Sequence, residues 1–497
     1  MEFEKNLKSI QEAGNLAVLG NKAAEALAEY SAEQIDRIIK NMVRVGEEHA
    51  LELAEMAVEE TGFGIVDDKV YKNHMATGML YESIKDMKTV GIINEDDEKK
   101  TVELAVPVGL VMGIVPSTNP TSTVLFKSII ALKSRNPIIF SPHPSAAKCT
   151  CRAAELMEEA AIEAGAPANS VNCLKNLSME ATDALMHSKE VKLIIATGGP
   201  GMVRAAYSAG KPAIGVGAGN SPAYIEKSAN VKDAVERIMA SKTFDNGTVC
   251  ASEQSIICEH SNEAEVIAEL KKQGGYFMSE EETKKVCKLL FKNGTAMNAK
   301  FVAKNPQVIA DAAGINIPEN TRLLVGRQKG VGDDDPLSHE KLTTVIAFYT
   351  VADWEEACEL SIRLLQNGIG HTMSIHTESP EMALRFAAKP ASRILVNTGG
   401  TQGGTGASTG LAPSFTLGCG TMGGSSVSEN VTPLHLINKK VLAYGTKDVR
   451  TLAEKDDVFQ KYHGRVEKNA LSDNDNGGIS ITESELKEII AEVIKAL

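Results

Sequence analysis

The segment Leu193-Ile194-Ile195-Ala196-Thr197-Gly198-Gly199-Pro200-Gly201 joins a short apolar run to a glycine-rich turn, and a helical pattern begins at Met202. A strand that enters a helix through such a turn is typical of parallel α/β sheets, where backbone N–H groups of the turn can approach a phosphate. The glycines do not follow the G-x-G-x-x-G order, so a tight turn without a ligand explains them about as well. The segment predicts an α/β fold. It also makes Thr197, Gly198, Gly199 and Gly201 candidate phosphate contacts.

The same alternation of strands and helices extends to both sides of this segment. Strands are expected at 110–115, 137–140, 171–174 and 191–196, and helices at 123–133, 146–164 and 179–188. A second α/β block is expected from Ser221, with strands at 255–258, 323–325, 345–348 and 373–376 and helices at 231–240, 264–273, 279–290 and 308–313. Strands that alternate with helices of this length imply right-handed crossovers and a parallel sheet.

Length and local composition suggest how the chain divides. At 497 residues, two or three domains are expected. Residues 1 to about 90 show helical spacing of apolar residues, and the alternation at 101–106 predicts a strand within a hairpin near 92–108. We therefore expect two parallel α/β domains that meet near Ser221. The glycine-rich stretch Gly399–Gly424 is expected to be an active-site or interface loop rather than part of a core.

Composition and charge exclude several classes of function. The formal net charge of −13 argues against surfaces that bind nucleic acid or anionic lipid. No apolar run is long enough for a transmembrane helix, and Met1–Lys5 does not look like the start of a secretory signal. The eight cysteines lack the spacing of a disulfide framework, which suits a reducing cytosol, and Cys149 and Cys151 lack metal-site spacing. We expect a cytoplasmic protein without a metal site.

The stretch Asn246-Gly247-Thr248-Val249-Cys250-Ala251-Ser252 contains the main candidate nucleophile. A turn-forming Asn-Gly pair follows an expected helix and places Cys250 just before an expected buried strand. A thiol at such a junction can face a cleft, which makes Cys250 a candidate for covalent catalysis. An ordinary buried cysteine is the alternative.

The C-terminal segment differs from the rest of the chain. Residues 464–480 form a polar linker, and Thr482 with Glu485 has the pattern of a capping box at the start of a helix over 481–497. The apolar residues of that helix fall on one face; they are Leu486, Ile489, Ile490, Val493, Ile494 and Leu497. A short amphipathic helix must bury such a face, either on its own domain or on another protein.

Six motifs occur in an order that resembles the aldehyde dehydrogenase superfamily. They are 115–120 (VPSTNP), 140–144 (FSPHP), 197–201 (TGGPG), 217–222 (GAGNSP), the Cys250 turn and 339–342 (HEKL). Residues 5 to 445 are similar to its coenzyme A-acylating branch, and 411–420 and 428–431 look like the aldehyde dehydrogenase half of bifunctional aldehyde–alcohol dehydrogenases. The resemblance implies two Rossmann-like domains, of which residues 1–220 bind NAD and residues 221–410 form the catalytic domain. It also implies that 411–463 return to the cofactor domain and the oligomer.

The resemblance carries a reaction with it. Hydrolytic members have a glutamate base where this chain has Val216, so an acyl-cysteine here is expected to resist water and to await the thiol of coenzyme A. Cys250 is expected to attack a short-chain aldehyde, acetaldehyde or propionaldehyde. Asn119 and the Cys250 backbone N–H are expected to hold the oxyanion. His371 matches a branch histidine that could accept a proton, with a packed core histidine as the alternative.

The cofactor contacts are also carried over from the family. Glu340 resembles the residue that bonds the nicotinamide ribose, although a surface acid is the alternative. The other expected contacts are Thr197, Gly198, Gly199, Gly201, Pro116, Ser117, Ser141, His143 and Gly217. The family favours NAD, but Ser141-Pro142-His143-Pro144 replaces the lysine that bonds the adenosine ribose in most hydrolytic members, so NADP stays open.

The family also suggests partners and alternatives. The helix at 481–497 resembles the encapsulation peptides of bacterial microcompartment enzymes, which implies binding to shell or cargo proteins. The hairpin and the strand-like segment after Val431 suggest a homodimer or a homotetramer. A hydrolytic or phosphorylating aldehyde dehydrogenase is one alternative, and a catalytically silent scaffold is another.

Overall fold

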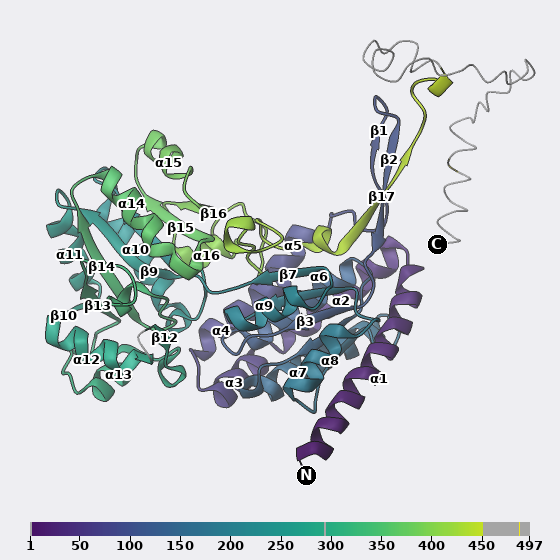
Figure 1. The fold of residues 1–497 in the computed structure, drawn as a ribbon, viewed down its shortest axis with the longest axis horizontal. Helices are drawn as coiled ribbons and strands as arrows, with labels where there is room; N and C mark the ends of the chain where they lie inside the picture. Colours follow the sequence, from purple (N-terminus) through teal and green to yellow (C-terminus); the bar gives the residue numbers. More distant parts are fainter. Residues whose placement is uncertain (1, 293–294, 451–486, 488–497) are drawn as a thin grey trace, which may run out of the picture.

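The computed structural model describes residues 2–292, 295–450 and 487. The expected linker at 464–480 lies outside the described residues, as does the expected helix at 481–497 apart from Lys487. The described chain forms two parallel α/β units, a helical N-terminal region and an antiparallel arm that projects from the body (Figure 1).

The first sheet has five parallel strands in the order β5-β4-β3-β6-β7. Its strands are β3 (Val111–Ile114), β4 (Ile138–Ser141), β5 (Val171–Cys173), β6 (Leu193–Thr197) and β7 (Ala213–Val216). The connecting helices are α6 (Pro120–Lys133), α7 (Ala147–Glu163), α8 (Met179–His187) and α9 (Pro200–Ser208). The fully buried Lys127 of α6 donates to Ile114 O at 2.7 Å and to Ile195 O at 3.0 Å, which joins β3 and β6 near their carboxyl ends.

The N-terminal helices complete the two layers over this sheet. They are α1 (Glu2–Ala28), α2 (Ala32–Glu48), α3 (Ala50–Thr61), α4 (Val66–His74), the π-helix η1 (Met75–Met79) and α5 (Leu80–Ile84). One apolar core unites α2, α3, η1, α6 and α7, and a second unites α1, α8 and α9 on the opposite face. Helix α2 begins at a capping box between Ser31 and Gln34 and buries Ile35, Ile38 and Ile39, as the apolar spacing predicted.

The second sheet has seven parallel strands in the order β10-β13-β14-β9-β8-β15-β16. The strands are β8 (Ser221–Ile225), β9 (Glu253–Glu259), β10 (Gly275–Met278), β13 (Leu323–Arg327), β14 (Val345–Val351), β15 (Gly370–His376) and β16 (Ala391–Val396). The helices are α10 (Val231–Thr243), α11 (Glu263–Lys272), α12 (Glu280–Leu290), α13 (Pro306–Ala313), α14 (Trp354–Leu365), α15 (Pro380–Phe386) and α16 (Gly400–Gly404). A two-stranded ribbon, β11 (Phe291–Lys292) and β12 (Ala296–Met297), lies beside α12. The prediction of an α/β fold with parallel sheets is confirmed.

The antiparallel arm consists of β1 (Gly91–Asp96), β2 (Thr101–Pro107) and β17 (Ile437–Ala443). The hairpin expected near 92–108 is present, and the segment after Val431 returns to pair with β2 within the same chain. Strand β17 is therefore an edge strand, and it exposes Val441, Leu442 and the adjoining Tyr444. An apolar edge of this kind favours pairing with another chain.

The glycine-rich stretch differs from the prediction. Much of Gly399–Gly424 is buried and packs behind the Cys250 turn, although we expected it to be a poor former of core structure. A Cβ on Gly400 would lie 2.3 Å from Ala251 O, and one on Gly404 would lie 2.9 Å from the Ala251 Cβ. The glycines here permit close packing of backbone on backbone, which composition alone did not reveal.

Candidate active site

A left-handed turn places Cys250 between α10 and β9. Asp245, Asn246 and Gly247 have φ values of 47°, 53° and 74° in succession. Asp and Asn tolerate this region better than other non-glycine residues, and at Gly247 a Cβ would lie 2.8 Å from Thr343 O. The sharp turn brings Val249 and Ala251 into an apolar cluster and leaves Cys250 partly exposed between them.

The thiol of Cys250 opens onto a cavity of about 950 Å³. The cavity lies at the carboxyl ends of β3, β4 and β6, beside the N-terminus of α9, which is where parallel α/β sheets bind ligands. Its lining includes most of the residues selected from the sequence. They are Pro116, Ser117, Asn119, Ser141, His143, Thr197, Gly198, Gly199, Gly217, Cys250 and Glu340.

Two selected residues do not line this cavity. Gly201 is the second residue of α9 and is exposed, but it is not among the residues that line the cavity. His371 is fully buried on β15 but reaches the site from behind, because its Nε2 lies 3.1 Å from Cys250 Sγ.

The contact between Cys250 and His371 has the geometry of a nucleophile and its base. His371 Nδ1 lies 2.8 Å from Thr372 Oγ1, so an Nδ1–H that donates to this hydroxyl leaves the lone pair of Nε2 facing the thiol. Burial, together with the charge of Arg393, lowers the pKa of His371 to about 3. Burial, together with Glu340, raises the pKa of Cys250 to about 12. The pair is therefore a neutral thiol and a neutral imidazole at neutral pH.

Asn119 lies at the junction between the first sheet and α6. It is the residue before Pro120, the first residue of α6, and its side chain makes no capping hydrogen bond. Instead its Oδ1 accepts from Lys72 Nζ at 2.7 Å, while its Nδ2 donates to Thr118 Oγ1 at 3.1 Å and to Thr248 O at 3.5 Å. The second Nδ2 contact is long, so this N–H has capacity for a stronger acceptor in the cavity.

Glu340 lies on a loop that a buried lysine holds in place. Lys341 Nζ donates to Leu337 O and His339 O, both at 2.6 Å, and Glu340 Oε1 accepts from Gly219 N at 2.9 Å. Burial raises the pKa of Glu340 to about 7. The carboxyl group thus faces the cavity from a fixed loop and is not a solvated surface acid.

Val216 ends β7 beside the nucleophile. It is 1% exposed and belongs to the apolar cluster of Val249, Ala251, Leu417 and Cys419, against which Cys250 packs. The Val216 side chain cannot remove a proton from water, because it has no polar atom.

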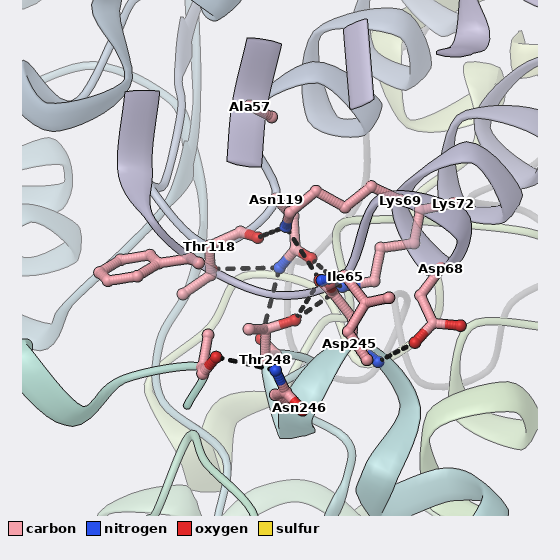
Figure 2. A network of polar contacts seen from close by, with 12 residues as sticks. Ala57, Ile65, Asp68, Lys69, Lys72, Thr118, Asn119, Asp245, Asn246 and Thr248 are labelled. Atoms are coloured by element: carbon pink, nitrogen blue, oxygen red, sulfur yellow. Dashed lines mark hydrogen bonds and ion pairs between the residues drawn. The ribbon is translucent and has the colours of Figure 1, made fainter. Parts of the chain in front are cut away.

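A group of buried charges beneath the site was not predicted. Lys69 and Lys72 of α4 both contact Asp245, and all three side chains are at most 3% exposed (Figure 2). Nothing in the local sequence distinguishes Lys69 and Lys72 from lysines on a solvated helix face. The buried helix face beside the turn of Cys250 could have been found only from tertiary contacts.

Comparison with known proteins identifies the family. The sequence model of the aldehyde dehydrogenase family matches residues 8–311 of this chain. The succinate-semialdehyde dehydrogenase (acetylating) of Clostridium kluyveri is 40% identical over 449 residues, which cover 90% of this chain and 98% of the relative. This chain belongs to the aldehyde dehydrogenase family. The bifunctional aldehyde–alcohol dehydrogenase of Escherichia coli (strain K12) is 47% identical over 85% of this chain and 48% of its own length, so the chain spans about half of that relative.

Solved structures of aldehyde dehydrogenases agree with this assignment. An acetylating aldehyde dehydrogenase from Geobacillus thermoglucosidasius has a TM-score of 0.88 and 52% identity, covering 89% of this chain and 98% of its own. A propionaldehyde dehydrogenase from the fucose utilisation microcompartment of Clostridium phytofermentans has a TM-score of 0.79 and 26% identity, covering 87% and 97%. The propionaldehyde dehydrogenase of Rhodopseudomonas palustris, solved with bound CoA and an acylated cysteine, has a TM-score of 0.79 and 25% identity, covering 87% and 97%.

Two kinds of feature are absent from the described residues of this aldehyde dehydrogenase. Among them, no helix combines the length and the apolar character needed to cross a membrane. The same residues contain no group of three or more His, Cys, Asp and Glu side chains that could hold a metal ion.

Proposed function

We propose that this aldehyde dehydrogenase oxidises a short-chain aldehyde, acetaldehyde or propionaldehyde, with NAD and coenzyme A to an acyl-CoA. The observation that carries the proposal is the contact of 3.1 Å between Cys250 Sγ and His371 Nε2 at the edge of the cavity, beside the apolar Val216. The acylated cysteine and bound CoA of the Rhodopseudomonas palustris relative support the same chemistry here.

The acylation step uses three residues of this chain. His371 Nε2 accepts the proton of Cys250 while the sulfur attacks the aldehyde carbon, so the neutral pair need not ionise beforehand. The Asn119 Nδ2–H and the Cys250 backbone N–H stabilise the resulting oxyanion. NAD, when bound, supplies the hydride acceptor. The acyl group then remains on Cys250 until the thiol of coenzyme A attacks it, and each of these steps is reversible.

The cavity supports the assignment of NAD. Its volume is at the upper end of the range for small-molecule sites, and its lining is mainly apolar. The backbone of Thr197-Gly198-Gly199 leads into the N-terminus of α9, which suits a pyrophosphate. We assign Pro116, Ser117, Ser141, His143 and Gly217 to the remainder of the cofactor and Glu340 to the nicotinamide ribose. The family favours NAD, which we propose as the usual cofactor. Ser141 to Pro144 contain no carboxylate that would repel the 2′-phosphate of NADP, so we propose that NADP is also accepted.

Steady-state kinetics test the activity. Aldehydes of two to four carbons are assayed with NAD or NADP, in the presence and absence of coenzyme A, and the products are identified as acyl-CoA or free acid. We expect continuous NADH formation only with coenzyme A, and a single turnover without it. Rapid release of free acid without coenzyme A would show a hydrolytic enzyme, and absence of NADH formation in all conditions would support a scaffold. Cys250→Ala is expected to abolish NADH formation.

The arrangement of the chain suggests how it assembles. We propose that residues 1–220 are the cofactor domain, 221–410 the catalytic domain and 411–463 the segment that returns to the cofactor domain. We also propose that the exposed edge of β17 joins two chains into a dimer or two dimers into a tetramer. Light scattering of the purified protein measures its oligomeric state. Val441→Lys on the exposed edge is expected to weaken the association between chains.

The tail supports a proposal about location. We propose that residues 481–497, joined by the linker at 464–480, recruit the enzyme to a bacterial microcompartment in the cytoplasm through shell or cargo proteins. The microcompartment origin of the Clostridium phytofermentans relative is consistent with this. Deletion of residues 480–497 is expected to leave activity intact and to abolish co-localisation with shell proteins, and retained co-localisation would refute the proposal.

A further inference from the structure

The buried charges beneath the active site connect two parts of the chain that meet there. Lys69 and Lys72 come from α4, and Asp245 comes from the turn that carries Cys250 (Figure 2). Charged groups taken from water are costly unless they are paired and hydrogen-bonded. Here each charged atom has such partners, so the cluster is a built structure that fixes α4 against the turn.

The contacts of Lys72 use the full capacity of its ammonium group. Lys72 Nζ donates to Asn119 Oδ1 at 2.7 Å, to Asp245 Oδ2 at 2.5 Å and to Thr248 Oγ1 at 2.7 Å. Thr248 Oγ1 in turn donates to Asp245 Oδ2 at 2.7 Å, which leaves the hydroxyl oxygen free to accept from Lys72. Three N–H groups therefore meet three acceptors.

We propose that Lys72 is a positioning residue for the oxyanion site, which orients and polarises the Asn119 amide and holds it in register with the turn of Cys250. The proposal rests on the proposed oxidation of an aldehyde through Cys250. The main observation behind it is that the buried ammonium of Lys72 contacts both the amide oxygen of Asn119 and Thr248, two residues before Cys250.

Orientation follows from the chemistry of the amide. A carboxamide has an acceptor end and a donor end, and Lys72 can bind only the acceptor end. Rotation of the Asn119 amide by half a turn would place its NH₂ group against a buried ammonium, with loss of a charge-assisted hydrogen bond. Lys72 therefore keeps Nδ2 on the opposite side, toward Thr248 O and the cavity that Asn119 and Cys250 both line.

Polarisation adds to orientation. A cation that binds the oxygen of an amide draws electron density from its nitrogen, and hydrogen bonds in a chain strengthen one another at low dielectric. The Asn119 N–H thus becomes a stronger donor to an oxyanion than an isolated amide would be. The charge of Lys72 remains one residue away from the reacting atoms, so it does not compete with Asn119 for the oxygen.

The same ammonium also contacts the turn that carries the second expected donor. The backbone N–H of Cys250 belongs to the turn whose conformation depends on Asp245 and Thr248. Asp245 is held further by its Oδ1, which accepts from Ile65 N at 2.7 Å, and by its own N–H, which donates to Asp68 Oδ2 at 2.7 Å. Ile65, Asp68 and Lys69 thus hold this turn independently of Lys72, and Lys72 sets the place of the Asn119 amide against it.

Lys69 provides a matched control. It lies one helical turn before Lys72, is equally buried and contacts the same Asp245 Oδ2 at 2.9 Å, but its other contact is Thr118 O at 3.1 Å. Lys69→Met and Lys72→Met each leave Asp245 with one ammonium. Only Lys72→Met removes the contact with the Asn119 amide.

The test measures the rate of a single turnover of NADH formation without coenzyme A, together with KM for aldehyde and the affinity for NAD. We expect Lys72→Met to lower the rate about 10- to 100-fold at unchanged NAD affinity, and Lys69→Met to lower it less than about threefold. Asn119→Ala should lower the rate about 10²- to 10³-fold, and adding Lys72→Met to Asn119→Ala should cost less than about threefold more.

Several results would overturn the proposal. They are a Lys72→Met rate close to that of the unaltered enzyme, an equal loss for Lys69→Met, or a full additional loss in the Asn119→Ala background. Should Lys72→Met fail to fold, Lys72→Gln replaces it, because glutamine keeps a donor for Asn119 without the charge and should lose only part of the rate. Failure of the unaltered protein to form NADH from any aldehyde would instead refute the proposed function.

Discussion

Replacement of His371 by alanine tests the central contact of the site. Without His371, sulfur can attack only as a preformed thiolate, and the Cys250 pKa of about 12 makes this species rare at pH 7.5. A difference of about 4.5 pH units corresponds to roughly one thiolate in 30,000 molecules. General-base catalysis typically contributes about 10²- to 10⁴-fold, so we expect the His371→Ala acylation rate to fall about 10³- to 10⁴-fold at pH 7.5.

The pH dependence gives the prediction its sign. The His371→Ala rate should rise about tenfold for each unit of pH above 7.5, because the thiolate fraction grows tenfold per unit below a pKa of about 12. The unaltered enzyme should show no such slope between pH 7 and 9. A single turnover of NADH formation without coenzyme A isolates this step from the later attack by the second thiol.

His376 supplies the control for this experiment. It lies on the same strand, is 1% exposed, and neither of its ring nitrogens has a hydrogen-bond partner within the described part of the chain. His376→Ala should therefore change the acylation rate less than about twofold. The reasoning would be refuted by a loss below tenfold in His371→Ala, or by a profile that stays flat with pH.

Three further predictions concern the surroundings of Cys250. Val216→Glu places a carboxyl group, with a pKa raised by burial, beside the acyl group, where it can act as a base toward water. Without coenzyme A, the rate at which this variant releases free acid should be at least about tenfold that of the unaltered enzyme, measured as continuous NADH formation. Gly219→Ala should abolish activity and lower the melting temperature, since its Cβ would lie 1.9 Å from Cys250 O, whereas Gly217→Ala has nothing within 4 Å of its Cβ and should keep its melting temperature. Glu340→Gln should raise the KM for NAD about tenfold above pH 8, where a carboxyl group with a pKa of about 7 is ionised. Two charge-assisted hydrogen bonds then become neutral ones, and the affinity for aldehyde should change little.

The sequence predicted the elements of the fold where periodicity was strong. The alternation of apolar strands with helices of ten or more residues located β3, β4, β5, β6 and the helices between them, because both faces of a parallel sheet must be covered. It missed β10 and β16, which lie at the two edges of the second sheet and are only partly buried. It also missed the strands β7 and β8 and the helices α14 and α15. It also underestimated the packing of Gly400 and Gly404, because glycine contributes to a core through close approach and not through apolar area.

For the site, the sequence identified residue types but not their supports. The turn before β9 suggested Cys250 as a nucleophile, and the family resemblance added Asn119, Glu340 and His371. The structure brings Cys250, Asn119 and Glu340 to one cavity and His371 into contact with the thiol. Lys72 could not be found in this way, because nothing local distinguishes a lysine that is buried against a distant turn from one in water. Its partners come from residues 47 and 173 positions away, a separation that no helical or strand pattern encodes.

The apolar surroundings of Cys250 affect the two halves of the reaction in opposite directions. Burial shifts the thiol pKa from 9.0 to about 12, so formation of a free thiolate costs about 4 kcal/mol more than in water. Attack with simultaneous proton transfer to His371 avoids that cost, because no isolated charge forms in the apolar cluster until the oxyanion donors are in place. In the proposed reaction, once the sulfur carries the acyl group, the apolar Val216 beside it offers no base that could remove a proton from an attacking water. The acyl-enzyme then persists until a thiol, which is intrinsically far more nucleophilic than water, enters the cavity.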